Sequence, residues 1–117
     1  MTRLLLIALG GALGALARYA VSAGIGHAVQ APFPFGTLVV NATGSFAMGV
    51  VYELASLIAL PPACRERTAI GFLGAYTTFS TLAVEASALL RDREVVPALL
   101  YLVATVLSGL LLCFAGM

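Results

Sequence analysis

Apolar residues dominate four stretches of the chain, and each stretch is about as long as a membrane crossing requires. A transmembrane helix needs about 20 consecutive, mostly apolar residues. The connections between the stretches are short, and the first contains Pro32 and Pro34. We therefore expect an all-α membrane protein with four transmembrane helices in a single domain, residues 1–117. The expected spans are Leu4–Ala23, Gly36–Leu60, Thr68–Leu90 and Val95–Gly116.

The third stretch is interrupted near its middle. Three threonines, a serine and two glycines fall between Gly71 and Thr81. Glycine is a poor helix former, and threonine hydroxyls can bond backbone carbonyls. In a bilayer, a loosened helix is stable only where other protein or a polar cavity takes up the freed backbone groups. We therefore expect a break between Gly74 and Ser80, where the backbone can bind an ion.

Composition supports the membrane assignment and excludes several functions. Of 117 residues, 62% are hydrophobic and only 9% are charged, whereas soluble domains carry about 25% charged residues. The net charge of +1 gives no electrostatic surface for nucleic acid, so no nucleic-acid partner is expected. Cys64 and Cys113 are far apart and form no CxxC pattern, so they suggest neither a metal site nor a disulfide.

Polar residues recur at helical spacing on the second and fourth spans. Each such residue has two interpretations: a hydrogen bond that holds two membrane helices together, worth about 1 kcal/mol, or a donor that faces a permeating ion. The polar faces of the second and fourth spans together predict a narrow path rich in hydrogen-bond donors. Their members are Thr37, Asn41 and Ser45 on the second span, and Tyr101, Thr105 and Ser108 on the fourth.

Three charged side chains lie within the apolar spans, where charge is costly and usually functional. One of them, Glu53, lies near the end of the second span and is expected to reach the interface. Arg18 lies near the end of the first span, either as an interface anchor beside Tyr19 or as a guanidinium that attracts anions at a pore mouth. Glu85 follows Thr78 by seven residues and shares its helix face. Glu85 is either the partner of a hydroxyl on a neighbouring helix or a direct participant in transport.

The arginines are nearly balanced across the membrane. With four spans, the N-terminus and the second connection lie on the same side, and the first and third connections on the other. The chain is therefore expected to insert in both orientations, since the positive-inside rule has little asymmetry to act on. The first side carries Arg3, Arg65 and Arg67, and the other carries Arg91 and Arg93, with Arg18 if it reaches outward.

Three motifs closely resemble the Fluc/CrcB fluoride channels, and the resemblance covers essentially the whole chain. They are Gly10-Gly-Ala-Leu-Gly-Ala-Leu-Ala-Arg18-Tyr, Gly36-Thr-Leu-Val-Val-Asn41-Ala-Thr-Gly-Ser-Phe, and Gly71-Phe-Leu-Gly-Ala-Tyr-Thr-Thr-Phe-Ser-Thr81 followed by Glu85. The resemblance implies a channel, not an enzyme, in a bacterial inner membrane. It also implies an antiparallel homodimer with two fluoride pores, surrounded by lipid, and fluoride resistance as the benefit to the cell.

The same resemblance assigns roles to individual residues. The backbone carbonyls of Gly74 and Thr77 would bind one structural sodium ion (Na+) on the twofold axis. Phe79 would present its ring edge to the anion, whereas Leu82 stands where the family usually has a second phenylalanine. The expected fluoride pathway comprises Arg18, Thr37, Asn41, Phe79, Ser80, Leu82, Glu85, Tyr101, Thr105 and Ser108.

Two other classes of protein compete with this interpretation. A small dual-topology, proton-coupled multidrug exporter has the same length and number of spans. It requires an acidic residue in its first span, and Leu4–Ala23 contains none. A non-transporting membrane subunit would explain the glycines but not the aligned hydroxyls.

Overall fold

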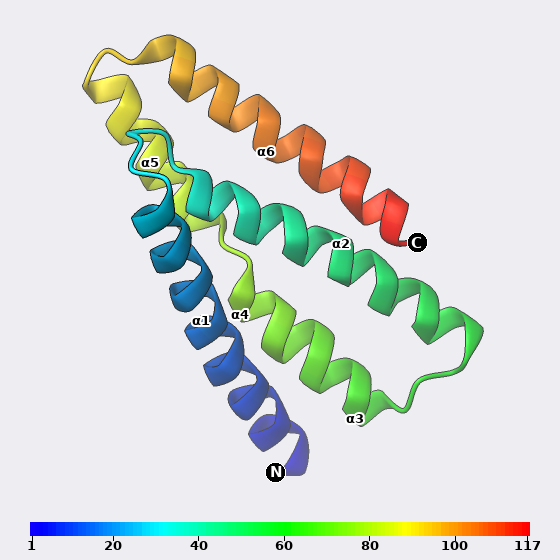
Figure 1. Ribbon diagram of the computed structural model, residues 1–117. Coiled ribbons are helices and arrows are strands. Elements are labelled where there is room, and N and C mark those ends of the chain that lie inside the picture. Colours follow the sequence, from blue (N-terminus) through cyan, green and yellow to red (C-terminus); the bar gives the residue numbers. More distant parts are fainter.

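The structure, a computed structural model that describes residues 1–117, contains helices and no strands. Helices α1, α2 and α6 are long and continuous, whereas the segment between α2 and α6 is divided into shorter helices (Figure 1). The all-α class and the bent third span expected from the sequence are thereby confirmed. The bounds are α1 Thr2–Ala28, α2 Phe35–Leu57, α3 Pro62–Arg65, the π-helix η1 Glu66–Leu73, α4 Gly74–Tyr76, α5 Phe79–Arg91 and α6 Val95–Gly116.

Three helices, α1, α2 and α6, are long and apolar enough to cross a membrane. The third crossing is in pieces, and none of them is long enough by itself. Only 15 of 117 residues are buried, so most of the large apolar side chains point out of the bundle. A water-soluble protein rarely exposes so much contiguous apolar surface. The chain is therefore a multi-pass membrane protein whose outer surface faces lipid or other protein.

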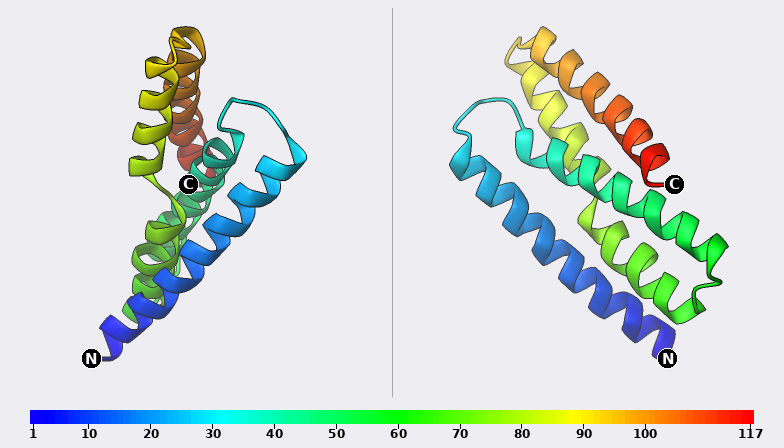
Figure 2. Two further views of the ribbon diagram at one scale, coloured as in Figure 1. Left: turned by 90° about the vertical axis from the view of Figure 1, so that its left-hand side faces the viewer. Right: turned by 45° about the vertical axis from the view of Figure 1, so that its right-hand side comes forward.

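The third span changes neighbours at its break. Before the break, η1 and α4 pack against α1, with α2 on their other side; after it, α5 packs against α6 (Figure 2). Helix α6 also runs along α2. The α1–α2 and α5–α6 connections lie at one end of the bundle, and the N-terminus and the α2–α3 connection lie towards the other (Figure 1). The break thus passes beside the first third of α2, where Asn41 is found.

The helix bounds differ from the expected spans most clearly in two places, and α2 also ends at Leu57, three residues before the expected Leu60. Helix α1 continues to Ala28, beyond the expected Ala23, and the third span begins at Pro62 rather than Thr68. Proline at the start of α3 is well suited to a first helical turn, since its missing N–H has no partner there. The eight-residue π-helix η1 was not expected, and π-helical turns are frequent at functional sites.

A glycine face on α1 lets the third span approach closely. A Cβ added to Gly10 would lie 3.1 Å from the backbone nitrogen of Phe72, and one added to Gly14 would overlap the Phe72 carbonyl. On the facing helix, a Cβ at Gly71 would lie 2.9 Å from the Ile7 carbonyl oxygen. Gly10 and Gly14 therefore form a close packing surface on α1. Their small size positions η1, and therefore the break that follows it.

Candidate functional site

The break consists of two extended residues that a side chain of α2 holds in place. Thr77 and Thr78 have ψ angles of 155° and 122°, so the chain leaves the helix and then re-enters it at Phe79. The buried Asn41 amide donates to the Thr78 carbonyl at 3.0 Å. Its own oxygen accepts the Thr78 N–H at 2.8 Å. Asn41 therefore satisfies both backbone groups of one break residue, as the membrane interior requires.

This pairing leaves other carbonyls of the break without helical partners. In a continuous helix the Thr78 N–H would bond the Gly74 carbonyl, but here it is donated to Asn41. The Thr77 carbonyl accepts no hydrogen bond. Because N–H and C=O point in opposite directions across a trans peptide, the Thr77 carbonyl points away from α2. The carbonyls of Gly74 and Thr77, which the sequence resemblance assigns to the sodium ion, thus both lack their usual helical hydrogen bond.

The threonine side chains of the break serve the backbone around them. The Thr77 hydroxyl donates to the Leu73 carbonyl at 3.0 Å, which closes the end of α4. Thr78 is the N-cap of α5: its oxygen accepts the Thr81 N–H at 3.3 Å, and its hydroxyl donates to the Thr81 hydroxyl at 3.0 Å. The cluster of hydroxyls is therefore a device that ends one helix and starts the next within the membrane.

A groove of about 470 Å³ lies beside the break, between α2 and α6. Its polar lining includes Asn41 and Thr105, and the buried Leu82 forms part of its apolar wall. The hydroxyls on α6 donate to their own helix, Thr105 to the Tyr101 carbonyl at 2.7 Å and Ser108 to the Thr105 carbonyl at 3.3 Å. The Thr105 hydroxyl would have to rotate before it could donate to an ion in the groove, and Ser108 does not line the groove.

Glu85 is held by two hydroxyls from neighbouring helices. Tyr101, fully buried, donates to Oε2 at 2.6 Å, and Thr37 donates to Oε1 at 3.0 Å. The Tyr101 ring is fixed in turn by an edge-on contact with Phe33, 5.5 Å between centroids. The arrangement matches the interpretation of Glu85 as the partner of hydroxyls on neighbouring helices. It also places a carboxylate where two donors converge.

Two cavities connect Glu85 to one end of the bundle. One, of about 240 Å³, lies beneath the α1–α2 connection and is lined by Ser22, Thr37 and Glu85. The other, of about 490 Å³, opens between Pro32 and Pro34 on one side and Asp92 and Glu94 on the other. Glu85 lines both, so water at this end of the bundle has a route to the carboxylate.

Four expected pathway residues line none of these cavities within one chain: Arg18, Ser80, Tyr101 and Ser108. Arg18 is half-buried on α1 and lines none of the cavities described above. Because α1 extends to Ala28, Arg18 lies about 15 Å before the helix end rather than at it. Ser80 is exposed, with its hydroxyl 3.4 Å from that of Thr78. Phe79 touches the groove, but its side chain is 81% exposed.

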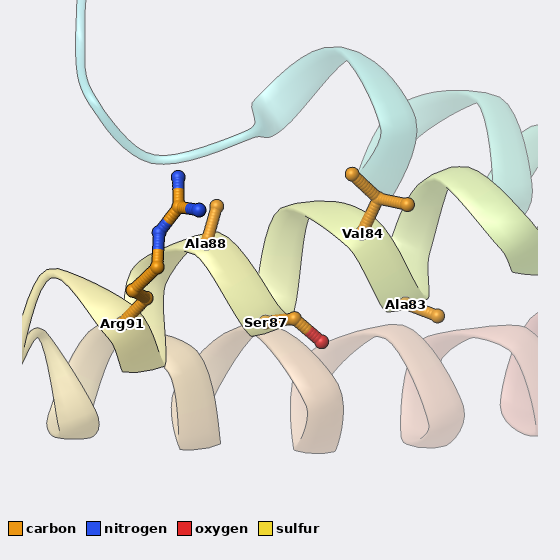
Figure 3. Close-up of a pocket in the computed structure, with 5 residues that line it drawn as sticks. All are labelled: Ala83, Val84, Ser87, Ala88 and Arg91. Carbon is orange, nitrogen blue, oxygen red and sulfur yellow. The ribbon is translucent and has the colours of Figure 1, made fainter.

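The outward face of α5 continues from Phe79 and is covered by no other helix. A shallow cavity of about 380 Å³ there is lined by residues of α5 alone (Figure 3). Apart from Arg91 at its end, the lining is small or apolar: Ala83, Val84, Ser87 and Ala88. Small residues on a membrane helix allow another helix to approach closely.

Comparison with known proteins agrees with this architecture. The family model described as CrcB-like protein, Camphor Resistance (CrcB), matches residues 5–117. Two relatives named fluoride-specific ion channel FluC are similar over nearly the whole length. One, from Thermus thermophilus, is 48% identical over 97% of this chain and 90% of its own length. The other, from a Shewanella species, is 41% identical over 99% and 94%, respectively. The resemblance inferred from the three motifs is confirmed: the chain belongs to the CrcB family of ion channels.

Proposed function

We propose that this chain is a fluoride-selective ion channel through which fluoride leaves the cell passively. The observation that carries the proposal is full-length similarity to fluoride-specific channels, together with a break whose backbone is held open inside the bundle. All of residues 1–117 form one four-span membrane domain. The relatives compared above are bacterial, which supports a place in a bacterial inner membrane, with fluoride resistance as the result.

The functional unit is an antiparallel homodimer with two pores. Three features support it. The arginines are nearly balanced between the two sides. The exposed ring of Phe79 continues into the uncovered face of α5. At Gly74 the backbone is exposed, and an added Cβ would meet only the Ala69 carbonyl oxygen, at 3.6 Å. A partner helix could therefore reach the break of each chain at Gly74.

A structural sodium ion at the dimer axis is held by the carbonyls of Gly74 and Thr77. These residues fit such an ion because the helical partner of the Gly74 carbonyl is diverted to Asn41 and the Thr77 carbonyl is unbonded. No group of three acidic, histidine or cysteine side chains competes for the role. Neutral carbonyl oxygens suit a hard monovalent cation better than a divalent one, which prefers carboxylates. When bound, the cation supplies positive charge that offsets the desolvation of a nearby anion.

The pathway uses donors that exchange partners as the anion passes. One N–H of the Asn41 amide bonds Thr78, and the second is free to donate to fluoride. The Thr37 and Tyr101 hydroxyls already bind an anion, the Glu85 carboxylate. Fluoride arriving there competes with that carboxylate for the same two donors. Ser80, Thr105, Ser108 and the positive ring edge of Phe79 extend the path, Leu82 narrows it, and Arg18 attracts the anion to its mouth.

The exporter alternative has no support. The first span contains no acidic residue, and the relatives compared above are named as fluoride channels. Glu85, the remaining candidate for proton coupling, is engaged by Tyr101 and Thr37.

The test is ion efflux from liposomes that contain the purified protein. Liposomes loaded with fluoride should empty when a potassium ionophore balances the charge, and liposomes loaded with chloride should not. Equal efflux of both ions would contradict selectivity. No efflux of fluoride from protein that remains folded would contradict the channel itself.

A further inference from the structure

Gly44 faces the break from α2, three residues after Asn41. It is buried, and its missing side chain leaves a slot that residues of the break occupy. A Cβ added to Gly44 would overlap the γ-methyl group of Thr77 and would lie 3.1 Å from Cδ1 of Tyr76. The atom in closest contact is thus a methyl group and not the backbone.

The methyl group cannot easily turn aside. The Thr77 hydroxyl donates to the Leu73 carbonyl at 3.0 Å, and the Thr77 N–H donates to the same oxygen at 3.1 Å. A β-branched side chain that is bonded in this way has one χ1 rotamer. With the hydroxyl directed to Leu73, the γ-methyl is directed to Gly44. Moving the methyl therefore means moving the backbone of Thr77.

We propose that the γ-methyl group of Thr77, seated in the slot at Gly44, positions the Thr77 carbonyl, which makes Gly44 a positioning residue for transport. This inference rests on the proposed function in that it assigns the carbonyl to the cation site. Asn41 holds the far side of the same peptide through the Thr78 N–H. The Thr77–Thr78 peptide plane, held only through the Thr78 N–H, could still tilt. The contact of the Thr77 methyl with Gly44 prevents this tilt.

The size of the expected displacement decides whether the contact matters. Carbon atoms pack at about 3.5 to 4.0 Å, so a Cβ at Gly44 would push Thr77 by roughly 1 Å, away from α2. That is the direction in which the Thr77 carbonyl points. Binding constellations tolerate errors of about 0.5 Å. A single methyl group on α2 should therefore disturb the site without removing any of its ligands.

The experiment is a set of four proteins: the parent, Gly44→Ala, Thr77→Ser, and the double variant. Gly44→Ala should lower fluoride efflux roughly tenfold or more, as overpacking commonly does. Thr77→Ser keeps the hydroxyl bond to Leu73 and the carbonyl, but it empties the slot at Gly44, so its efflux should also fall, by less than that of Gly44→Ala. In the double variant the alanine Cβ at position 44 takes the place of the missing threonine methyl in the slot, so most of the lost efflux should return.

Two glycines provide matched controls. A Cβ at Gly49 would overlap the carbonyl of Cys113, so Gly49→Ala should be impaired and Thr77→Ser should not rescue it. A Cβ at Gly11 would meet its nearest neighbours at 3.9 and 4.0 Å, so Gly11→Ala should behave as the parent. Parental efflux in Gly44→Ala, or equal rescue of Gly44→Ala and Gly49→Ala, would overturn the inference.

A second measurement separates positioning from general stability. The sodium concentration for half-maximal efflux should rise in Gly44→Ala and return in the double variant. If the parent conducts fluoride without sodium, the proposed sodium site is wrong. The rescue of efflux in the double variant still tests the contact between the Thr77 methyl and Gly44. If Gly44→Ala does not fold, recovery of monodisperse protein in the double variant supports the contact, and failure to recover it contradicts the contact.

Discussion

Asn41 combines two roles that a set of substitutions can separate. Its amide holds both backbone groups of Thr78, and its second N–H is proposed to contact fluoride. Asn41→Asp keeps the acceptor for the Thr78 N–H but places a second oxygen 3.0 Å from the Thr78 carbonyl, where a donor was. Asn41→Ala removes both bonds and adds no charge. The two variants therefore damage the break differently.

The cost can be estimated from the two bonds. Losing the donor bond removes about 1 kcal/mol, and a buried oxygen that faces another oxygen costs about 1 to 3 kcal/mol more. Asn41→Asp should therefore lose about 2 to 4 kcal/mol of stability. Asn41→Ala leaves two backbone groups without partners and should lose a similar amount. If the amide also contacts the anion, the aspartate adds repulsion, so its efflux should fall more than about 100-fold, below that of the alanine variant.

Efflux and thermal unfolding in detergent should be measured on the same preparations. The control is Gly11→Ala, whose added Cβ would meet its nearest neighbours at 3.9 and 4.0 Å and which should therefore conduct as the parent. Normal efflux in Asn41→Asp would refute the contact with fluoride. Asn41 would then serve only to hold two membrane helices together through hydrogen bonds. Equal efflux in the aspartate and alanine variants, at equal stability, would lead to the same conclusion.

Three other predictions test the assembly and the pathway. Tags at the termini should be accessible from both sides of the membrane in equal amounts; a single orientation would contradict the antiparallel dimer. Gly74→Val should weaken dimerisation in a cross-linking assay yet leave the chain folded, because its Cβ has room within the chain. Gly14→Ala, in contrast, should impair folding. Dimers at the parental level in Gly74→Val would show that no partner chain contacts this face. Phe79→Ile should lower efflux at least about tenfold, since it removes the ring edge, whereas Leu82→Phe should keep or raise it; parental efflux in Phe79→Ile would exclude ring-edge coordination.

The break and the glycine packing could be predicted because they depend on local chemistry. Glycine and threonine weaken a helix wherever they occur, and the expected break between Gly74 and Ser80 contains the observed one at Thr77 and Thr78. The self-bonding of Thr105 and Ser108 could have been anticipated too, since hydroxyls in helices commonly bond a carbonyl one turn back. The hydroxyl pattern alone suggested free donors, and the structure shows them engaged.

Other features depend on long-range contacts that leave no local signal. The pairing of Asn41 with Thr78 depends on how far α2 and the third span are shifted along each other. The spacing of residues within either helix does not determine that shift. The π-helix η1 differs from an α-helix in its hydrogen bonds and not in its residue types. Phe79 is exposed in the single chain, and the contacts that its ring makes in the proposed dimer leave no signal in the sequence around it. In each case the feature depends on a residue or hydrogen bond elsewhere in the structure, which the local sequence does not reveal.

The most direct test of the ion-binding role of the break is fluoride efflux measured with and without sodium. Here a proton ionophore replaces the potassium ionophore, so that charge is balanced without potassium. Protein purified and reconstituted without sodium or potassium should lose fluoride efflux, and sodium alone should restore it, because the carbonyls of Gly74 and Thr77 then regain the cation that they are proposed to hold. Thr77→Ser should also require sodium, at a higher concentration, since it retains the carbonyl but lacks the methyl contact proposed to position it. Full fluoride efflux in rigorously sodium-free, potassium-free preparations would contradict a structural cation at the break.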